Sequence, residues 1–361
     1  MPDNKELLAA VASTLTTLPY ETWNFGDSVA FEAMIEAAEH LDDASLFSFA
    51  HGWARAWSSQ QRPFRRLDCT APGLALTLIA EKAGDSALLV RVVELARYLR
   101  ERPRLAGLFE TWVHSPLMLP YGGEPMPPSE AALLADPPPG VFLDCMHFDP
   151  PFFAALGRVT EDADLIAEAV DQQVRYIDTL QREDGLFQHF VLRGQFETFG
   201  PGWGRGQGWA LLGMLDVLDQ VAATPLALVE PHAESIEKIR GAAHALVLRQ
   251  MALQRADGHW WAVVDNPQSG EEFSTAAFMA AGFYRAIRQG IVTEEEAREP
   301  AERAVQAIVA GVDGGGRLRE VSAAVMACTV ASHYAHVPRG FVVPWGQGPA
   351  VLALIEAARR A

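Results

Sequence analysis

The feature that most constrains the fold of this chain is a pair of helical segments that recurs along its length. Within one segment, apolar residues return at the spacing of a helix turn, as Ile166, Val170 and Ile177 do. A leading helix at residues 5–15 and a closing helix at 349–360 are expected to pair with each other. The other pairs are expected at residues 29–39 and 46–57, 72–82 and 87–100, 151–156 and 160–180, 209–221 and 231–250, and 275–289 and 293–310.

The loops between these pairs share one style. Each follows the second helix of a pair and joins a turn-forming glycine, in three of the four an Asp-Gly or Gly-Gly step, to apolar or aromatic residues. They lie at residues 107–110, 184–189, 257–261 and 314–318. Repeated helix pairs with equivalent loops at one end are typical of a toroid, in which an outer ring of helices wraps an inner ring. We therefore predict an all-α fold, an (α/α)6 barrel of six helical hairpins without a central sheet.

A proline-rich stretch at residues 120–139 interrupts the repeat. Because the helical pattern resumes beyond it in the same style, we expect one long loop rather than a linker between domains. A loop of this length often lies over a functional site. With 361 residues, 49% of them hydrophobic, the chain can bury a sizeable core. The prediction is a single domain over residues 1–361.

The charge and the cysteines of the chain limit its partners and its compartment. A formal net charge of −17 argues against nucleic acids and anionic membranes. Cys69, Cys145 and Cys328 are far apart and odd in number, which fits a reducing compartment better than a disulfide framework. We expect neither a signal peptide nor a membrane-spanning segment. The expected location is the cytoplasm.

The segment at residues 203–209, WGRGQGW, carries the most distinctive chemistry. Its glycines allow a sharp bend where a loop becomes a helix. Trp203 and Trp209 offer flat faces for a ring, and Arg205 offers a forked donor that suits a carboxylate. The alternative is that the tryptophans belong to the core. In a toroid the aromatic loops gather at one mouth, which favours a binding site.

Asp144 is the leading candidate for an acid, since it lies in an apolar context at the start of a helical segment. Burial of its carboxyl group there would raise the pKa toward a value useful for general acid catalysis. The alternative is a helix cap, but Asp149, directly before Pro150, is the better candidate for that cap.

Asp68 and His189 are further candidates with plausible structural alternatives. Asp68 could pair with a neighbouring arginine or cap a helix, and His189 could be a packed or solvated loop histidine. Metal-ligand spacings and phosphate-binding loops are missing from the sequence, so we expect no metal and no nucleotide.

At this point the chain resembles the unsaturated glucuronyl and rhamnogalacturonyl hydrolases of glycoside hydrolase families 88 and 105. The resemblance covers nearly the whole chain and is fairly specific in the WGRGQGW string together with an upstream Asp in LDCM. It implies a barrel of six α-hairpins, as the repeat predicts independently. The matching residues are Trp23 to Gly26, Asp68, residues 143–146 and 151–154, 185–189, 203–209, 272–276 and 346–348.

The resemblance also implies a reaction. These families act on the unsaturated uronic acid that polysaccharide lyases leave at the non-reducing end of oligosaccharides, and they hydrate its C4=C5 double bond. Asp144 matches the proton donor and water activator, and Asp68 matches a second acid that holds the sugar and tunes Asp144. The residues that match the ring-binding positions are Trp23, His189, Trp203, Arg205 and Trp209.

Three departures from the family pattern concern the substrate more than the chemistry. Gln207 is closer to the glucuronyl family, residues 147–150 replace a more apolar stretch, and residues 120–139 have no clear match. We expect a rhamnogalacturonyl hydrolase rather than a glucuronyl hydrolase, without a cofactor, acting as a monomer or homodimer.

Two other functions stay open at this point. The first is another toroid carbohydrate enzyme, such as a sugar epimerase, for which replacement of His189 would abolish activity and Asp144 could be spared. The second is a non-catalytic sugar-binding toroid, which would bind oligosaccharide without turnover.

Overall fold

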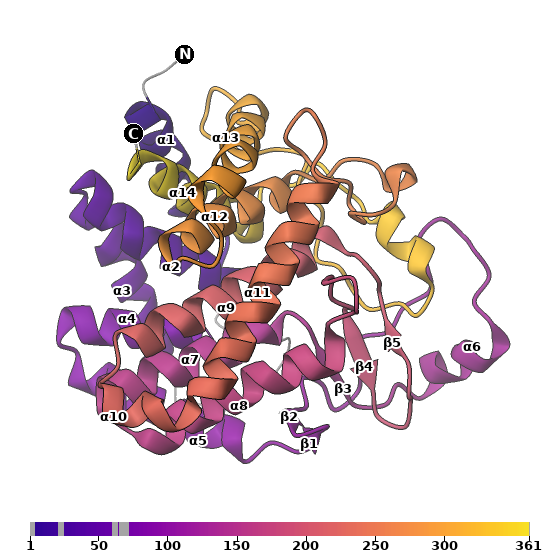
Figure 1. The fold of residues 1–361 in the computed structure, drawn as a ribbon, viewed down its shortest axis with the longest axis horizontal. Coiled ribbons are helices and arrows are strands. Elements are labelled where there is room, and N and C mark those ends of the chain that lie inside the picture. Colours follow the sequence, from indigo (N-terminus) through magenta and orange to yellow (C-terminus); the bar gives the residue numbers. More distant parts are fainter. Residues whose placement is uncertain (1–3, 21–24, 60–63, 65–71, 361) are drawn as a thin grey trace.

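The computed structural model describes residues 4–20, 25–59, 64 and 72–360. Helices dominate these residues and form an inner and an outer layer (Figure 1). The inner helices are α2 (Phe25–Leu41), α4 (Gly73–Ala83), α7 (Cys145–Thr160), α9 (Gly204–Ala222), α12 (Phe273–Arg288) and α14 (Pro344–Ala358). The outer helices are α1 (Asn4–Leu15), α3 (Ala44–Ser58), α5 (Ser86–Arg100), α8 (Ala163–Leu180), α11 (Ala233–Leu253) and α13 (Glu294–Gly311).

The inner helices form a closed ring. Each packs against the next inner helix along the chain, and α14 packs back against α2. The outer helices cover this ring, with α1 on α14, α3 on α2, α5 on α4, α8 on α7, α11 on α9 and α13 on α12. The expected pairing of the first and last helices is confirmed, and α1 and α14 lie together in Figure 1. The fold is the predicted (α/α)6 barrel.

The two layers differ in sequence because they differ in burial. Residues 204–218 of α9 and 274–286 of α12 are buried on every side, as expected of helices that are apolar all round. Outer helix α8 buries one face and exposes charged residues on the other. Asp162 caps α8 by accepting from the backbone of Asp164 and Leu165.

The repeated loops are equivalent in structure as well as in sequence. Gly185, Gly258 and Gly316 all have positive φ angles, of 88°, 85° and 77°. A Cβ atom at each would lie within 3 Å of a backbone carbonyl oxygen, at Ala245, Arg303 and Ala10 respectively. Glycine is therefore required twice over, for the left-handed backbone and for the close approach to the next outer helix.

Two local predictions are wrong. Helix α7 begins at Cys145 and continues through Pro150, so Asp149 lies inside the helix and does not cap it. Pro150 and Pro151 lie in the second turn of α7, where each removes one backbone N–H donor from the helix. The stretch at 120–139 is not purely loop, since it contains α6 (Pro128–Ala135).

Short strands gather at the end of the barrel where the inner helices begin. A hairpin pairs β1 (Arg104–Leu105) with β2 (Leu108–Phe109), and an antiparallel sheet has the order β3 (Gly140–Phe142), β4 (Phe190–Leu192), β5 (Thr198–Phe199). In Figure 1 this sheet and α6 lie on the right-hand side. Shorter helical turns are α10 (Leu226–Val229), η1 (Glu230–His232), η2 (Pro267–Ser269) and η3 (Ala331–His336). Among the described residues, no helix has the length and apolar character needed to cross a membrane.

A close contact between the backbones of two neighbouring inner helices gives a stability prediction. A Cβ atom on Gly213 of α9 would lie 2.3 Å from the backbone oxygen of Met146 in α7. Because backbone cannot move aside cheaply, Gly213→Ala is expected to lower the free energy of unfolding by about 1–3 kcal/mol in urea titrations. Gly241→Ala is the matched control, since Gly241 lies in outer helix α11 with no atom within 4 Å of its added Cβ. That variant should gain about 1 kcal/mol from helix propensity, and equal effects of the two variants would contradict the packing argument.

Candidate active site

The three-stranded sheet brings Asp144 and His189 together. Phe142 of β3 pairs with Phe190 of β4, so the residues that follow and precede these positions lie opposite each other. One more backbone hydrogen bond extends the pairing of β3 and β4, because the amide of Leu143 donates to the carbonyl of His189 at 2.7 Å. Asp144, the next residue, therefore faces His189 although 45 positions separate them in the sequence.

The Asp144 carboxyl group does not cap helix α7. Asp144 occupies the N-cap position of α7, but its side chain makes no cap hydrogen bond. It is 6% exposed, and its Oδ2 lies 3.2 Å from Nε2 of His189. A nearly buried carboxyl group held by an imidazole at the mouth of the barrel is suited to donate and accept protons. This geometry supports the interpretation of Asp144 as an acid rather than a cap.

His189 is enclosed on several sides. Trp203 packs against its ring at a centroid distance of 4.6 Å, and Phe142 meets it edge-on at 5.5 Å. Its Nδ1 lies 2.7 Å from the hydroxyl of Tyr334 in η3. With 2% of its surface exposed, His189 is a packed histidine, but both of its nitrogens face polar groups at the site.

Arg205 lies beneath this pair and is fully buried. Its guanidinium donates to the Ser322 hydroxyl at 2.6 Å and to the Ala323 carbonyl at 2.8 Å, and it pairs with Glu272 at 3.3 Å. Burial lowers the pKa of Arg205, while the negative charges of Glu272 and Asp144 oppose that shift. Arginine stays protonated nevertheless, so a buried guanidinium, partly balanced by Glu272, lies below the site.

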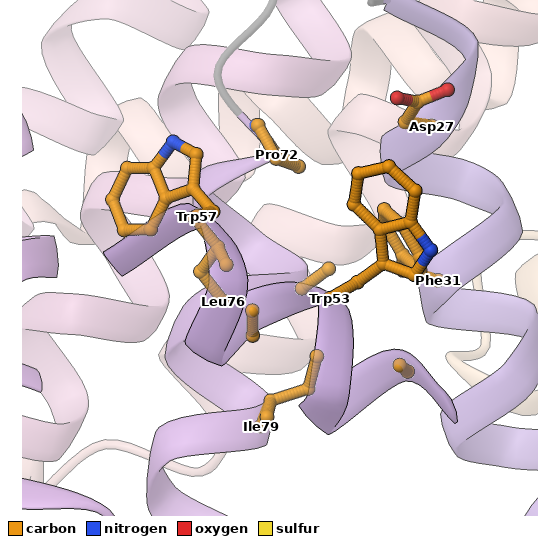
Figure 2. Close-up of a pocket in the computed structure, with 10 residues that line it drawn as sticks. Asp27, Phe31, Trp53, Trp57, Pro72, Leu76 and Ile79 are labelled. Atoms are coloured by element: carbon orange, nitrogen blue, oxygen red, sulfur yellow. The ribbon is translucent and has the colours of Figure 1, made fainter. Parts of the chain in front are cut away.

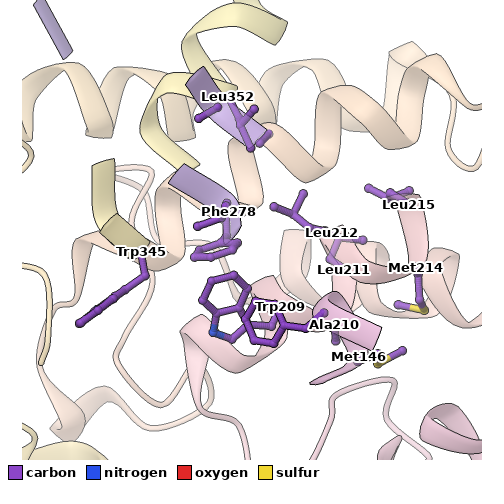
Figure 3. Close-up of a cluster of buried hydrophobic side chains, with 14 of the residues drawn as sticks. Met146, Trp209, Ala210, Leu211, Leu212, Met214, Leu215, Phe278, Trp345 and Leu352 are labelled. Carbon is purple, nitrogen blue, oxygen red and sulfur yellow. The ribbon is translucent and has the colours of Figure 1, made fainter. Parts of the chain in front are cut away.

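Trp209 lies farther inside the barrel than Trp203. Its indole has no exposed surface and packs against Phe278 at 4.6 Å, His147 at 5.1 Å and Phe148 at 5.2 Å. Figure 3 shows it within the cluster of apolar side chains from the inner helices. In this arrangement Trp209 supports the site from the core.

Two predicted site residues, Trp23 and Asp68, lie outside the described residues.

A small apolar pocket is lined by helices α2, α3 and α4 (Figure 2). Trp53, Trp57 and Phe31 line it, with Asp27 at its edge. Among the described residues, the lining offers flat apolar surface with Asp27 as its single ionisable group.

Sequence reasoning missed the roles of two residues that hold the site, Tyr334 and Glu272. Tyr334 had no recognisable pattern, because η3 lies in an irregular segment. Glu272 caps α12 by accepting from the amide of Thr275, but Glu is not among the preferred N-cap residues, so the string EFST carries no signal for this role. Its carboxylate also accepts from the backbone amide of Ser322 at 3.0 Å, which joins α12 to the loop that binds Arg205.

A second charged cluster lies inside the ring, away from the mouth. Nε2 of His147 is 3.3 Å from Glu32, and its Nδ1 is 3.4 Å from Asp216. The second oxygen of Glu32 accepts from Ser28 at 2.6 Å, and the second oxygen of Asp216 accepts from Arg285 at 2.7 Å. These three side chains form the single cluster among the described residues with a ligand set that could hold a metal ion.

The protonation of His147 follows from its two neighbours. A metal ion binds one ring nitrogen of a histidine, whereas here each nitrogen faces a different carboxylate. Burial by itself lowers the pKa of His147, but Glu32 and Asp216 outweigh burial and raise it to about 9. We interpret the cluster as a protonated imidazole between two carboxylates. On its far side Glu32 and Asp216 line a cavity of about 200 Å³, together with Arg285.

Comparison with known proteins agrees with the fold. The chain is 25% identical over 338 residues to the "Unsaturated rhamnogalacturonyl hydrolase YesR" of Bacillus subtilis (strain 168), covering 92% of this chain and 89% of that protein. The solved structure of a possible GH105 member from Salmonella enterica has a TM-score of 0.81 at 20% identity, covering 99% of this chain and 94% of that chain. The unsaturated glucuronyl hydrolase of Bacillus sp. GL1 has a TM-score of 0.67 at 18% identity, covering 98% and 95%.

The two structures, at this low identity, share the fold with this chain. The sequence profile of Glycosyl Hydrolase Family 88 matches residues 7–361, which is nearly the whole chain. The protein therefore belongs to Glycosyl Hydrolase Family 88.

Proposed function

We propose that this hydrolase removes a 4,5-unsaturated uronic acid from the non-reducing end of oligosaccharides produced by polysaccharide lyases. The observation that carries the proposal is the Asp144–His189 pair at the mouth of the barrel, with a contact of 3.2 Å. The family membership and the likeness to an unsaturated rhamnogalacturonyl hydrolase support the same reaction.

In the proposed reaction, Asp144 adds water across the C4=C5 double bond. The protonated carboxyl group donates its proton to C4, and the resulting carboxylate takes a proton from the water whose oxygen bonds to C5. The product at C5 is a hemiketal, which opens to a ketone and leads to loss of the glycosidic bond. Asp144 ends protonated, as it began, so no cofactor is needed. An ordinary glycosidase instead flanks the anomeric carbon with two carboxyl groups.

The other site residues would bind and orient the ring. His189 holds Oδ2 of Asp144, and Trp203 forms the wall behind His189. Arg205 supplies positive charge below the site, which an anionic substrate needs on a chain with a net charge of −17. Asp68 as the second acid and Trp23 as a ring-binding residue remain proposals from the family resemblance. Trp209 has no exposed surface, so we propose that it supports the site from behind and does not contact the ring.

We propose unsaturated rhamnogalacturonyl disaccharides as the preferred substrates. The support is the relative from Bacillus subtilis, which matches 92% of this chain and is named for that activity. The glucuronyl hydrolase structure is less similar, with a TM-score of 0.67 against 0.81 for the GH105 structure.

We further propose that residues 1–361 act as one catalytic domain, as a monomer or homodimer, in the cytoplasm. The reduced and buried Cys145 and Cys328 are consistent with that compartment. Size-exclusion chromatography with light scattering would show the oligomeric state.

The test of the function is loss of the ultraviolet absorbance of the conjugated enol acid. Purified protein is mixed with unsaturated rhamnogalacturonyl, glucuronyl and galacturonyl disaccharides, and the decay of the band is followed. We expect decay, fastest with the rhamnogalacturonyl disaccharide. A constant band with every substrate would reject the hydration reaction, and fastest decay with a glucuronyl disaccharide would reject the substrate assignment alone.

A further inference from the structure

A tyrosine that the sequence does not single out completes the surroundings of His189. Tyr334 is 145 residues away in the chain, it is buried, and its hydroxyl lies 2.7 Å from Nδ1 of His189. We propose that Tyr334 is a positioning residue that fixes the tautomer of His189, and that residues 117–135 brace Tyr334. The kinetic part of this inference rests on the proposed function.

The direction of the hydrogen bond follows from the surroundings of the Tyr334 hydroxyl. Burial raises the pKa of Tyr334 well above its usual value, so the hydroxyl keeps its proton. The backbone of Cys328 opposes this shift and lowers the pKa of Tyr334, which is the effect of an amide that donates to the hydroxyl oxygen. Since a backbone amide can only donate, the hydroxyl must donate its own hydrogen bond to a different group. Nδ1 of His189 is the acceptor in reach.

This bond determines which nitrogen of His189 faces Asp144 as a donor. A neutral imidazole carries one proton, so an accepting Nδ1 leaves the proton on Nε2. Nε2 then donates toward Oδ2 of Asp144, 3.2 Å away. In the other tautomer, a lone pair on Nε2 would accept the proton that the carboxyl group of Asp144 must give to C4 in the proposed reaction. Tyr334 therefore acts on Asp144 through His189, by keeping the carboxyl group in one orientation.

The Tyr334–His189 contact depends on a glycine. Gly200 follows β5 and has a φ of 73°. A Cβ atom there would lie 2.5 Å from the Tyr334 hydroxyl and 2.6 Å from Cβ of His189. The backbone is thus shaped to let the two side chains meet.

The segment before α6 packs directly against the segment that carries Tyr334. The amide of Met118 donates to the carbonyl of Ala327 at 3.0 Å. The ring of Tyr121 stacks on His333 with centroids 4.8 Å apart and planes 14° from parallel. The amide of Tyr121 also donates to Nδ1 of His333 at 3.2 Å. His333 is the residue immediately before Tyr334.

Further contacts hold the same two segments together. The hydroxyl of Thr329 donates to Glu130 of α6, and the hydroxyl of Ser332 donates to Glu124. Burial lowers the pKa of His333 to about 4, so the ring is neutral and its Nδ1 can accept from the backbone. These contacts show how residues 117–135 brace η3, the helical turn that carries Tyr334.

The first test replaces the hydroxyl alone. Tyr334→Phe keeps the ring, and we expect kcat with the unsaturated disaccharide to fall about 10–100-fold, as for other outer partners of functional histidines, with KM nearly unchanged. ¹⁵N NMR of the His189 ring should show the proton on Nε2 in the wild type and a mixture of tautomers in the variant. Tyr176→Phe, at another buried tyrosine outside the site, is the matched control and should change neither reading.

The second test addresses the brace. Tyr121→Ala removes the stack on His333 and should lower kcat in the wild type but not further in Tyr334→Phe, because both act through one contact. Ser129→Ala, at an exposed position of α6, should leave kcat unchanged.

The results of these tests distinguish the positioning role of Tyr334, the brace and the proposed function from one another. Unchanged kcat and unchanged His189 nitrogen signals in Tyr334→Phe would overturn the positioning role. Equal losses from Tyr121→Ala in both backgrounds would overturn the brace. If the wild type hydrates no unsaturated disaccharide, the proposed function fails, and the NMR reading alone decides whether Tyr334 fixes His189.

Discussion

Asp144→Asn is expected to lower kcat by about two to four orders of magnitude while the protein stays folded. An amide keeps the size of the carboxyl group and can still accept from Nε2 of His189, so the local geometry survives. It cannot donate a proton to C4 or take one from water at neutral pH. General acid–base groups contribute about 10²–10⁴-fold to rates, which sets the expected loss.

The measurement is the decay of the enol-acid absorbance under saturating disaccharide, with the circular dichroism spectrum and Tm recorded alongside. Asp164→Asn is the matched control, because Asp164 is exposed at the start of α8 and should tolerate the same change. Near-normal turnover by Asp144→Asn would remove this residue from the mechanism and move the search for the acid to Asp68.

His147→Met is expected to lower the free energy of unfolding by about 3–5 kcal/mol. The substitution removes the positive charge between Glu32 and Asp216 and leaves both carboxylates buried. Removing one partner of a buried charge cluster costs about this much, since an uncompensated charge remains. Asp216 keeps its hydrogen bond to Arg285 at 2.7 Å, so the uncompensated buried charge is mainly that of Glu32. Urea titration gives the measurement, and His244→Met, at an exposed histidine of α11, is the control.

A second substitution tests the reason for this loss. Glu32→Gln in the His147→Met background removes the stranded charge and should recover part of the lost stability. If the double variant is no more stable than the single one, packing rather than charge explains the effect.

The same cluster predicts how stability depends on pH. The pKa of His147 is about 9 in the folded protein and 6.5 for an ordinary histidine, so the folded state holds this proton more tightly. The stabilisation is fully present below pH 6.5 and is lost as the pH rises through 9. The difference in pKa corresponds to about 3 kcal/mol. His147→Met should lack this loss between pH 7 and pH 10; an equal decline in both proteins would exclude His147 as its source.

The acidic and aromatic site candidates were recognisable because they stand beside sequence signals. Asp144 follows an apolar strand and precedes a helix, and His189 closes one of the repeated Asp-Gly loops. The WGRGQGW string identified Trp203, Arg205 and Trp209 as candidates. It could not show that Trp209 lies farther inside the barrel than Trp203. A helix start reveals which residues lie near the mouth, whereas burial depends on which helices surround them.

The sequence by itself determined the layered ring of helix pairs. Helical periodicity and the repeated loop glycines are local properties, and closing the ring is the way in which such pairs bury their apolar faces. The tertiary structure alone decided how the site is held. Tyr334 meets His189 across 145 residues, and His147 gathers Glu32 from α2 and Asp216 from α9. Such contacts join segments that are distant in the chain, and their hydrogen bonds and charges depend on positions that exist only once the ring has closed.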